Sequence, residues 1–394
     1  MKSSPPMTAP LTIEGALLTS LDGRMVADPV IETPDAAADA GARLDAEVEA
    51  FGATSPAITA AHWRRVRSRC AAFGPEVVRL LDEAAASDGG KHLRPRLVAA
   101  AYFAFGGADH RLLGEVAGAQ QLLHLGLCMH DDLIDGDRRR HGRPNLLAAY
   151  EAGDRAAGLT DAAADRHAMA AALLAGDLAL NAALLALLDA PAPAQLQQRL
   201  AAEAAAALER TIAGELLDVR SELVRPDLAD PLRVAELKTA VYSVSLPLRL
   251  GAIAAGVASV DVLDSLDRVG LAFGIAYQLA DDDLGLFGTE AVTGKSVRSD
   301  LQQGTRTELI RLAYGRLDAA GRAMLDAVLG APSVTDRDVD LVRDLVLRSG
   351  ARDAVAVAVD EHVARGIRIA EADLPGPLAT HLARLARSMR SRTR

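Results

Sequence analysis

The stretch EVAGAQQLLHLGLCMHDDLID, residues 115–135, decides the fold class. It reads as a buried helix that runs directly into Asp131. On a helix Asp131 and Asp135 lie about 40° apart on one face, and Asp132 flanks them. Like charges this close repel unless a cation lies between them, and Mg²⁺ prefers carboxylate, water and phosphate oxygens. For this motif alone, an acidic helix end in surface ion pairs with the following arginines is an equally good explanation.

A second acidic cluster follows another apolar helix. In FGIAYQLADDDLGLFG, residues 273–288, Asp281, Asp282 and Asp283 stand in succession. A solvated turn would explain this cluster on its own. Two acidic helix ends far apart in the sequence can instead face each other across one cavity. Together they would hold several Mg²⁺ ions around a single diphosphate.

Basic and polar residues supply the complementary charge. In SDGGKHLRPRL, Lys91 and Arg94 share a helix face, so both can reach one phosphate from the positive end of that helix. The alternative is a helix start with solvated basic side chains. Lys295 lies in a glycine-flanked loop after the second cluster. Lys238 and Thr239 form a polar pair in an apolar helix, which favours contact with a ligand or a partner.

Composition favours an all-helical protein and argues against several functions. The 394 residues are 50% hydrophobic but only 3% aromatic, and the long segments are rich in the helix formers Ala and Leu. The net charge of −10 argues against nucleic-acid binding, which needs a basic surface. Two cysteines, Cys70 and Cys128, suit a reducing cytoplasm. No stretch reaches the roughly 18 consecutive apolar residues of a membrane span, and no signal peptide is evident, so we expect a cytoplasmic protein without an integral membrane segment.

The chain is organised as one helical unit after an N-terminal tail. Residues 1–45 are rich in Pro, Ala, Asp and Thr without periodicity, which predicts a disordered tail. From 46 to 394 helical patterns follow one another, with no composition shift and no internal repeat. Apolar residues recur at multiples of four from Leu196 to Leu216, which predicts one helical face. Charged clusters at the ends of apolar helices predict an active site at the mouth of a helix bundle.

Six motifs in order make the chain resemble the trans-isoprenyl diphosphate synthase (polyprenyl synthetase) family from about residue 74 to the C-terminus. GGKHLRP resembles the family's GGKxxRP and HDDLID its first aspartate-rich motif DDxxD, while GRP, KTA, YQLADD and TGKSVRSDL match further motifs. The resemblance implies a single bundle of mostly antiparallel helices around a deep central cavity, usually built as a homodimer. It also implies that an allylic diphosphate ionises, loses pyrophosphate and is attacked by isopentenyl diphosphate.

The resemblance further implies roles for individual residues. Mg²⁺, three ions per active site, would be bound with the allylic diphosphate by Asp131, Asp132, Asp135, Asp281 and Asp282. That diphosphate would also contact Arg140, Lys238, Thr239, Gln278 and Lys295. Isopentenyl diphosphate would be held by Lys91, Arg94, His124 and, where the family has an arginine, His141. The aspartates and Lys238 would be catalytic, because metals and lysines stabilise the charge that develops on the leaving pyrophosphate.

The chain departs from the family pattern at three positions. Gly285 stands where the second motif has its last aspartate, and Asp283 is a candidate substitute that faces another way. His141 replaces the second arginine of an expected pair. Thr305 stands where the family commonly has a lysine, and the neighbouring Arg306 is a candidate substitute.

Product length is predicted from the residues below the first motif. One helix turn rises about 5.4 Å, comparable to an isoprene unit. Gly126 and Leu127 lie five and four residues before Asp131. In the resembling family, bulky aromatics at these positions are associated with a fifteen-carbon product. Gly126 leaves space instead, which predicts geranylgeranyl diphosphate, and close helix packing is the alternative use of this glycine. Synthases of farnesyl or longer polyprenyl diphosphates are the other candidates.

Two rival functions would use a similar scaffold. A class I terpene cyclase needs a second metal motif with Asn or Asp, then Ser or Thr, then Glu, and DDDLGLFGTE does not supply it. The paired Lys91 and Arg94, needed only for a second diphosphate substrate, also favour condensation. A non-catalytic partner subunit is supported only by Gly285, His141 and Thr305. Because both acidic clusters are retained, we expect an active prenyltransferase.

Overall fold

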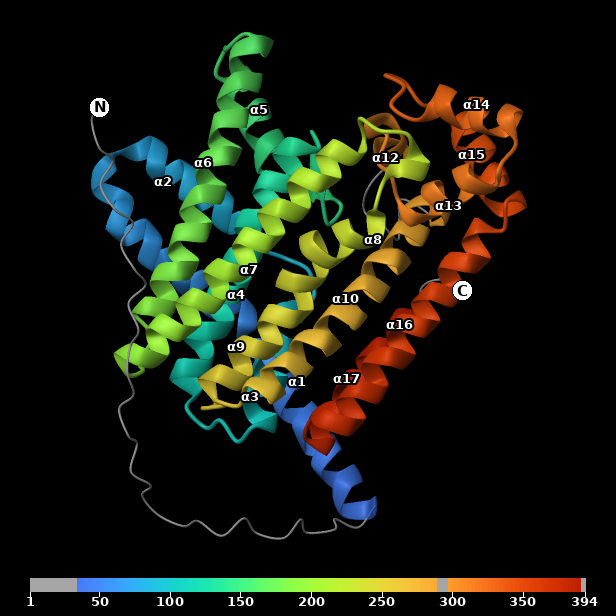
Figure 1. The fold of residues 1–394 in the computed structure, drawn as a ribbon. Helices are drawn as coiled ribbons and strands as arrows, with labels where there is room; N and C mark the ends of the chain where they lie inside the picture. Colours follow the sequence, from blue (N-terminus) through green and yellow to red (C-terminus); the bar gives the residue numbers. More distant parts are fainter. Residues whose placement is uncertain (1–33, 289–296, 391–394) are drawn as a thin grey trace, which may run out of the picture.

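The protein is built almost entirely of helices. A computed structural model describes residues 34–288 and 297–390. In these two ranges the one sheet is a hairpin of two short strands. Figure 1 shows the long helices lying side by side in a bundle. The predicted all-α bundle is therefore confirmed, whereas the depth of its central cavity stays a prediction.

The elements have the following bounds. The first α-helices are α1 (Pro34–Cys70), α2 (Pro75–Ala86), α3 (Leu93–Ala104), α4 (His110–Ile134), α5 (Leu146–Ala156), α6 (Asp161–Leu188), α7 (Ala194–Ser221), α8 (Pro231–Val234) and α9 (Leu246–Ala254). They are followed by α10 (Val260–Phe287), α12 (Val297–Gln303), α13 (Glu308–Arg316), α14 (Ala319–Val328), α15 (Asp336–Arg348), α16 (Ala351–Asp373) and α17 (Gly376–Arg390). The other elements are the 3₁₀ helices η1 (Ala71–Phe73) and η2 (Pro226–Leu228), the π-helix η3 (Ala235–Ser245) and the strands β1 (Arg139–Arg140) and β2 (Arg143–Pro144).

Helices α4 and α10 run through the bundle, and each has one of the two acidic clusters near its C-terminal end. α4 packs mainly on α6, and α10 packs on η3 and α16. At the start of α4 the Asp109 side chain accepts hydrogen bonds from the N–H groups of Arg111 and Leu112. Ser259 caps α10 in the same way through the N–H of Val262. These caps satisfy N–H groups that a helix start leaves unpaired and so define where each helix begins.

The polar pair of the sequence lies on the π-helix η3. This element continues from α8 and runs into α9, where Pro247 has no N–H to donate to the preceding turns. π-helical turns are rare and occur frequently at functional sites. Gly214 of α7 packs directly on η3, since a Cβ at Gly214 would lie 2.3 Å from the backbone nitrogen of Lys238. The missing side chain therefore brings the neighbouring Glu215 next to Lys238.

One predicted boundary is corrected by the structure. α1 begins at Pro34, inside the tail predicted for residues 1–45, and its Leu44 and Val48 are buried. From residue 34 onward the chain forms a helix instead of the predicted disordered tail. This helix packs on α3 and α17, because it has apolar side chains to bury. Residues 1–33 lie outside the described residues.

The leucine pattern of α7 is also corrected. Leu200 and Ala204 are buried, but Ile212 and Leu216 are 55% and 69% exposed. Each step of four residues turns a helix about 40° beyond a full turn, so a stripe at strict multiples of four winds around the helix instead of following one face. The face that α7 buries instead continues through small residues to Gly214.

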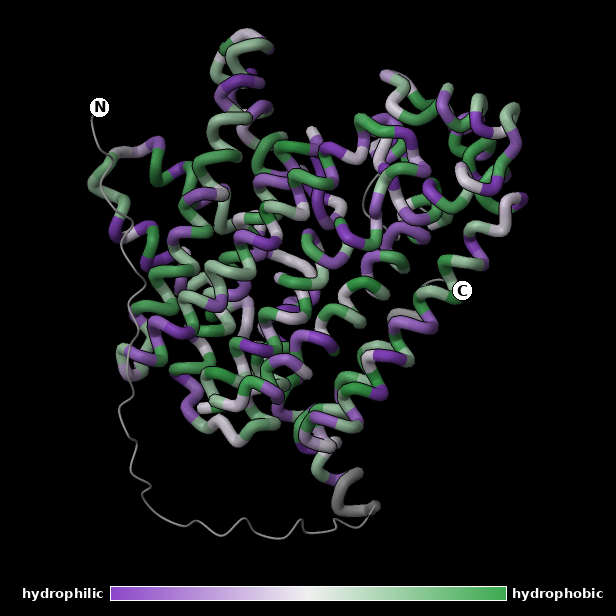
Figure 2. Tube along the Cα trace, viewed as in Figure 1, coloured by the Kyte–Doolittle hydropathy of each residue, from purple (hydrophilic) through white to green (hydrophobic). Residues whose placement is uncertain are grey.

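Helix α6 has apolar residues on nearly all sides. Among the described helices it is the one that is long and apolar enough to cross a membrane by composition, but 50% of its apolar window is buried inside the protein. The buried side packs on α4 and α5, as in the core helix of a bundle. Figure 2 shows hydrophobic and hydrophilic segments alternating along the long helices. The other side of α6 exposes an apolar face made of Met169, Leu173, Leu174, Leu185 and Leu188, called here the α6 face.

Candidate active site

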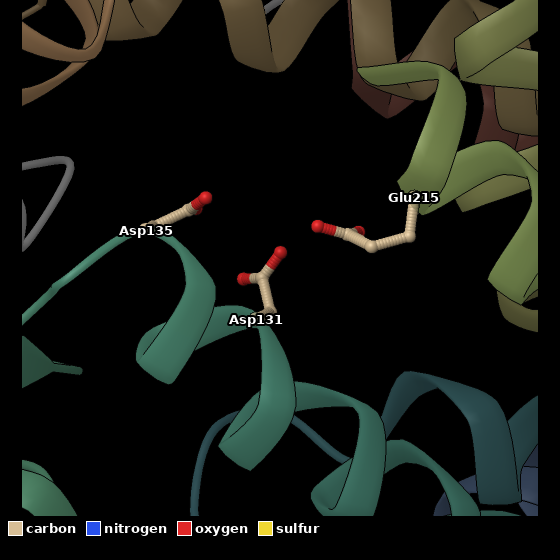
Figure 3. Close-up of side chains that lie close together, drawn as sticks. All are labelled: Asp131, Asp135 and Glu215. Atoms are coloured by element: carbon tan, nitrogen blue, oxygen red, sulfur yellow. The ribbon is translucent and has the colours of Figure 1, made fainter. Parts of the chain in front are cut away.

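Three carboxylates meet at the end of α4. One oxygen from each of Asp131, Asp135 and Glu215 lies within 4.8 Å of the other two. Figure 3 shows the two aspartates rising from the last turn of α4 and Glu215 reaching toward them from α7. The predicted shared helix face of Asp131 and Asp135 is confirmed. Clustered carboxylate oxygens from two helices suit a hard divalent cation such as Mg²⁺.

The β1–β2 hairpin brings Arg140 back to this helix end. His141 and Gly142 form its two-residue turn with φ values of 52° and 72°, and this left-handed pair is the type I′ turn that favours glycine. The Arg140 Nη2 atom donates to Asp131 Oδ2 at 2.9 Å and to Asp132 Oδ1 at 2.7 Å. Arg140 therefore holds the two neighbouring aspartates in place.

Lys238 extends from η3 into the same cluster. Its Nζ atom lies 3.2 Å from Asp131 Oδ1, 2.9 Å from Glu215 Oε2 and 2.8 Å from Asp218 Oδ2. Burial alone would lower the pKa of Lys238, but the surrounding carboxylates, led by Asp131, raise it far above its ordinary value. The ammonium therefore stays charged and ties the end of α4 to α7.

The residue after Lys238 connects η3 to the second acidic cluster. Thr239 Oγ1 donates to Gln278 Oε1 at 2.7 Å, and Gln278 Nε2 donates to Asp282 Oδ1 at 2.7 Å. Burial raises the pKa of Asp282 well above its ordinary value, and the charge of Asp281 beside it raises it further. Of two consecutive residues of η3, Lys238 thus contacts the first acidic cluster and Thr239 is linked through Gln278 to the second, so both clusters lie near the same part of η3.

A basic group lies on the α3 side of η3. The Arg94 guanidinium donates to Ser243 Oγ at 2.7 Å and to Tyr242 Oη at 3.1 Å, and its Nη1 lies 3.2 Å from His124 Nε2. Burial, together with the positive charge of Arg94, lowers the pKa of His124 well below its ordinary value, so the ring is neutral. Arg94 and His124, predicted to bind one substrate, are therefore in contact.

The other two residues predicted for that substrate are Lys91, in the turn before α3, and His141, in the hairpin that packs against this turn. Lys91 is exposed. A Cβ at Gly90 would lie 3.2 Å from His141 Cε1, so the His141 ring lies against the turn. Burial and the charges of Arg140 and Arg143 lower the pKa of His141. The hairpin thus faces the Gly-Gly turn with a neutral ring flanked by arginines.

Known proteins share both the sequence and the fold. The family model described as Polyprenyl synthetase matches residues 76–346. A Mycobacterium tuberculosis protein named (2E,6E)-farnesyl diphosphate synthase is 33% identical over 303 residues, covering 75% of this chain and 78% of the relative. The chain belongs to the polyprenyl synthetase family. It is therefore an enzyme of the trans-prenyltransferase type, and the sequence prediction of the family is confirmed.

Two further similar proteins are named for geranylgeranyl diphosphate, a longer product than farnesyl diphosphate. A geranylgeranyl diphosphate synthase of Mycobacterium tuberculosis is 30% identical over 287 residues, covering 72% of this chain and 75% of the relative. The solved geranylgeranyl pyrophosphate synthase of Corynebacterium glutamicum, complexed with isoprenyl diphosphate and magnesium, is 27% identical with a TM-score of 0.80 and covers 87% of this chain and 98% of that one. The metal bound by that solved structure, magnesium, is the one predicted from the sequence of this chain. These named synthases give no support to a cyclase or a non-catalytic subunit.

The structure answers whether Asp283 replaces the missing last aspartate of the second motif. Asp283 is buried and accepts hydrogen bonds from Arg352 Nε and Nη2 at 2.8 and 3.0 Å. It therefore does not face the site. A Cβ at Gly285 would instead lie 3.2 Å from Asp300 Oδ2, so a carboxylate of α12 occupies the space beside this glycine.

Arg306 does not substitute for the lysine that Thr305 replaces. Its guanidinium donates to the backbone oxygens of Glu222 and Val224 at 3.1 Å each, and also to that of Gly304. Arg306 is thus a structural residue that holds the chain after α7. Lys295, the remaining predicted contact with the allylic diphosphate, lies outside the described residues.

The space expected at Gly126 is filled. A Cβ at Gly126 would lie 3.0 Å from the backbone oxygen of Gly176 and from Leu180 of α6. The prediction that Gly126 leaves room for hydrocarbon is therefore wrong, because α6 occupies the space into which a side chain at this position would point. Its use is close packing of α4 on α6. Leu127 is half-buried and packs against the core.

Two acidic residues of the site were missed in the sequence. Glu215 and Asp218 stand three residues apart near the end of α7 and share a face at helical spacing. Both contact Lys238. The signal in the sequence was a pair of acidic residues at helical spacing after Gly214.

Proposed function

We propose that this enzyme condenses isopentenyl diphosphate with an allylic diphosphate and releases pyrophosphate. The observation that carries the proposal is the position of η3, where Lys238 binds the first acidic cluster and Thr239 is linked through Gln278 to the second. A diphosphate at this end of the bundle is then within reach of both clusters. The proposed primers are dimethylallyl, geranyl and farnesyl diphosphate.

In this proposal the aspartates of both clusters hold three Mg²⁺ ions, which neutralise the leaving pyrophosphate. Basic side chains of the protein supply the remaining positive charge around the leaving pyrophosphate. Arg140 and Lys238 are held by carboxylates in this structure and turn their donors to the diphosphate when it binds, with Lys295 as a further contact. They stabilise the negative charge as the carbon–oxygen bond of the allylic substrate breaks.

The second substrate is assigned to the basic group on the α3 side of η3. Arg94 is directed by Ser243 and Tyr242, and neutral His124 lies beside it. With Lys91 and His141 at the adjoining turn, this group binds the diphosphate of isopentenyl diphosphate. The double bond of that substrate attacks the allylic cation, and the departing pyrophosphate takes the proton that is then lost. No protein nucleophile is required.

The proposed main product is geranylgeranyl diphosphate. Support comes from the likeness to proteins named geranylgeranyl synthases. Farnesyl diphosphate is the second candidate, favoured by the 33% identity to a protein named farnesyl diphosphate synthase.

Chromatography of products tests both the reaction and its length. The protein is incubated with Mg²⁺, radiolabelled isopentenyl diphosphate and each allylic primer in turn. A twenty-carbon main product from all three primers supports the proposal, and a product that stops at fifteen carbons selects the second candidate. Chelation of the metal should abolish turnover and added Mg²⁺ should restore it. No product with any primer, or a hydrocarbon from geranylgeranyl diphosphate alone, would overturn the assigned reaction.

The proposed assembly is a cytoplasmic homodimer that covers the α6 face. This face exposes five large apolar side chains along one helix, which is costly in water. A second copy related by a twofold axis presents the same apolar residues and buries both. Cys70 and Cys128 are free thiols, which suits a reducing compartment.

A further inference from the structure

Glu215 has a carboxylate that lies outside the six motifs quoted from the sequence. It comes from α7, whereas Asp131 and Asp135 come from α4, yet one oxygen of each residue lies within 4.8 Å of the others. In Figure 3 the Glu215 side chain extends toward the two aspartates. The close packing of Gly214 on η3 holds this part of α7 in place.

One oxygen of Glu215 lacks a partner in the part of the chain that the structure describes. Its Oε2 atom binds Lys238 Nζ at 2.9 Å. Its Oε1 atom is shielded from solvent and has no hydrogen-bond partner among the described residues. A buried carboxylate oxygen without a partner is unfavourable, and a cation bound beside it removes that penalty.

The ammonium of Lys238 lies where these carboxylates converge. It contacts Asp131, Glu215 and Asp218 at 2.8 to 3.2 Å, so it balances part of their charge in the protein without metal. A divalent cation attracted to the same oxygens competes with this ammonium. Displaced from the carboxylates, Lys238 can donate its hydrogen bonds to a diphosphate instead.

We propose that Glu215 is a third carboxylate ligand of the magnesium site at the end of α4. The site then spans α4 and α7, and three carboxylates bind a Mg²⁺ ion before any diphosphate arrives, leaving the other coordination positions to water and phosphate oxygens. This inference rests on the proposed use of Mg²⁺ by Asp131 and Asp135. It adds a ligand to that site and an order of binding in which the first metal enters ahead of the substrate.

The test measures metal binding without substrate. Mn²⁺, which replaces Mg²⁺ in oxygen sites and is visible by electron paramagnetic resonance, is titrated into the full-length protein and into Glu215→Gln. Loss of one charged ligand should weaken the tightest Mn²⁺ site at least about tenfold, while circular dichroism and the unfolding temperature stay close to those of the unsubstituted protein. Glu209→Gln, an exposed position on the same helix, is the matched control and should bind Mn²⁺ unchanged.

A second variant separates ligation from a structural role. Lys238→Met removes the competing ammonium, so it should tighten Mn²⁺ binding in the substrate-free protein, and this gain should be lost when Glu215→Gln is added. If Glu215 only positions Lys238, Glu215→Gln will raise the KM for the allylic diphosphate and leave Mn²⁺ affinity unchanged. That result, or an unsubstituted protein that binds no Mn²⁺ without diphosphate, overturns the inference. Neither result removes the prenyltransferase assignment, which depends on product formation by the unsubstituted enzyme.

Discussion

Asp282 and Asp283 are adjacent in α10 and have opposite environments. Asp282 accepts a hydrogen bond from Gln278 at the site, whereas Asp283 pairs with Arg352, whose guanidinium lies 4.0 Å from the centre of the Phe287 ring. Successive helix residues turn by about 100°, and this turn directs Asp283 away from the side of α10 that Asp282 presents to the site. One of the pair belongs to the site and the other to the packing of α10 on α16.

This difference predicts opposite effects of two substitutions. Asp283→Ala leaves the Arg352 guanidinium, which is 35% exposed, without its bidentate partner and should lower the free energy of unfolding by about 2 kcal/mol. Asp282→Asn keeps the packing but removes a proposed metal ligand, so it should lower kcat/KM about 100-fold or more with little change in stability. Urea unfolding and steady-state kinetics of both variants check this. A stable but inactive Asp283→Ala protein would contradict it.

At the scale of elements, the contact between α4 and α6 depends on small residues. Gly126 of α4 lies against Gly176 of α6, and a Cβ at Gly176 would lie 2.2 Å from the His130 ring. The two helices therefore approach each other closely just below the acidic end of α4. Substitutions at these glycines act first on helix packing and only then on the space available to a hydrocarbon chain.

Gly126→Ala should therefore destabilise the protein although alanine is the better helix former. The methyl group must displace α6 atoms at 3.0 Å, and overpacking of this kind typically costs about 1–3 kcal/mol of unfolding free energy. Gly315 in α13 is the matched control, because a Cβ there meets nothing within 4 Å. Gly315→Ala should stabilise by up to about 1 kcal/mol through helix propensity. Urea unfolding compares the pair, and equal effects would argue against tight packing at Gly126.

Local sequence patterns predicted the helices and the site residues that several of them contribute. They did not predict which residues of different helices come into contact. The spacing of Asp131 and Asp135 placed both on one helix face because that depends only on helix geometry. Glu215 and Asp218 were missed because their partner Lys238 is far along the chain and reaches them only through the close contact at Gly214. Which face of α7 is buried likewise depends on its neighbours and not on its own leucines.

At the scale of the whole molecule, the α6 face is where we expect a second copy. Leu174, which is 53% exposed, lies midway along it. Leu174→Glu would place two like charges in a twofold interface and should shift the protein from dimer toward monomer. Sedimentation equilibrium gives the mass of each form. Leu347→Glu, at an equally exposed leucine of α15, should leave the mass unchanged. A dimer that persists in Leu174→Glu would place the interface elsewhere.

The pH dependence of stability should carry the signature of His62, which joins α1 to α4. A Cβ at Gly118 would lie 2.1 Å from this ring, and the side chain is 4% exposed. Burial lowers the pKa of His62 from 6.5 to about 4, opposed by Glu115 and reinforced by Arg65 and Arg69. Between these two pKa values the unfolded chain binds a proton that the folded protein does not. The free energy of unfolding therefore falls as the pH falls through this window.

The contribution of His62 amounts to roughly 2 kcal/mol lost between about pH 7 and about pH 5. His62→Gln removes this titration, so its unfolding free energy should fall by about that much less over the same interval. His110→Gln, an exposed control at the start of α4, should show the full loss. Urea unfolding at the two pH values measures the difference, and identical pH profiles for His62→Gln and the unsubstituted protein would show that His62 titrates normally.

The π-helix η3 fixes the length of its own segment. Each of its hydrogen bonds spans one residue more than an α-helical bond, so deleting one residue between 235 and 245 would let the segment revert to an α-helix. Everything on one side of the deletion would then rotate by about 100° relative to the other side. Either Lys238 would lose its acidic neighbours or Pro247 and α9 would be turned out of the core. An insertion or deletion in η3 should therefore abolish either the site or the packing of α9, whereas the same change in a surface loop should leave both intact.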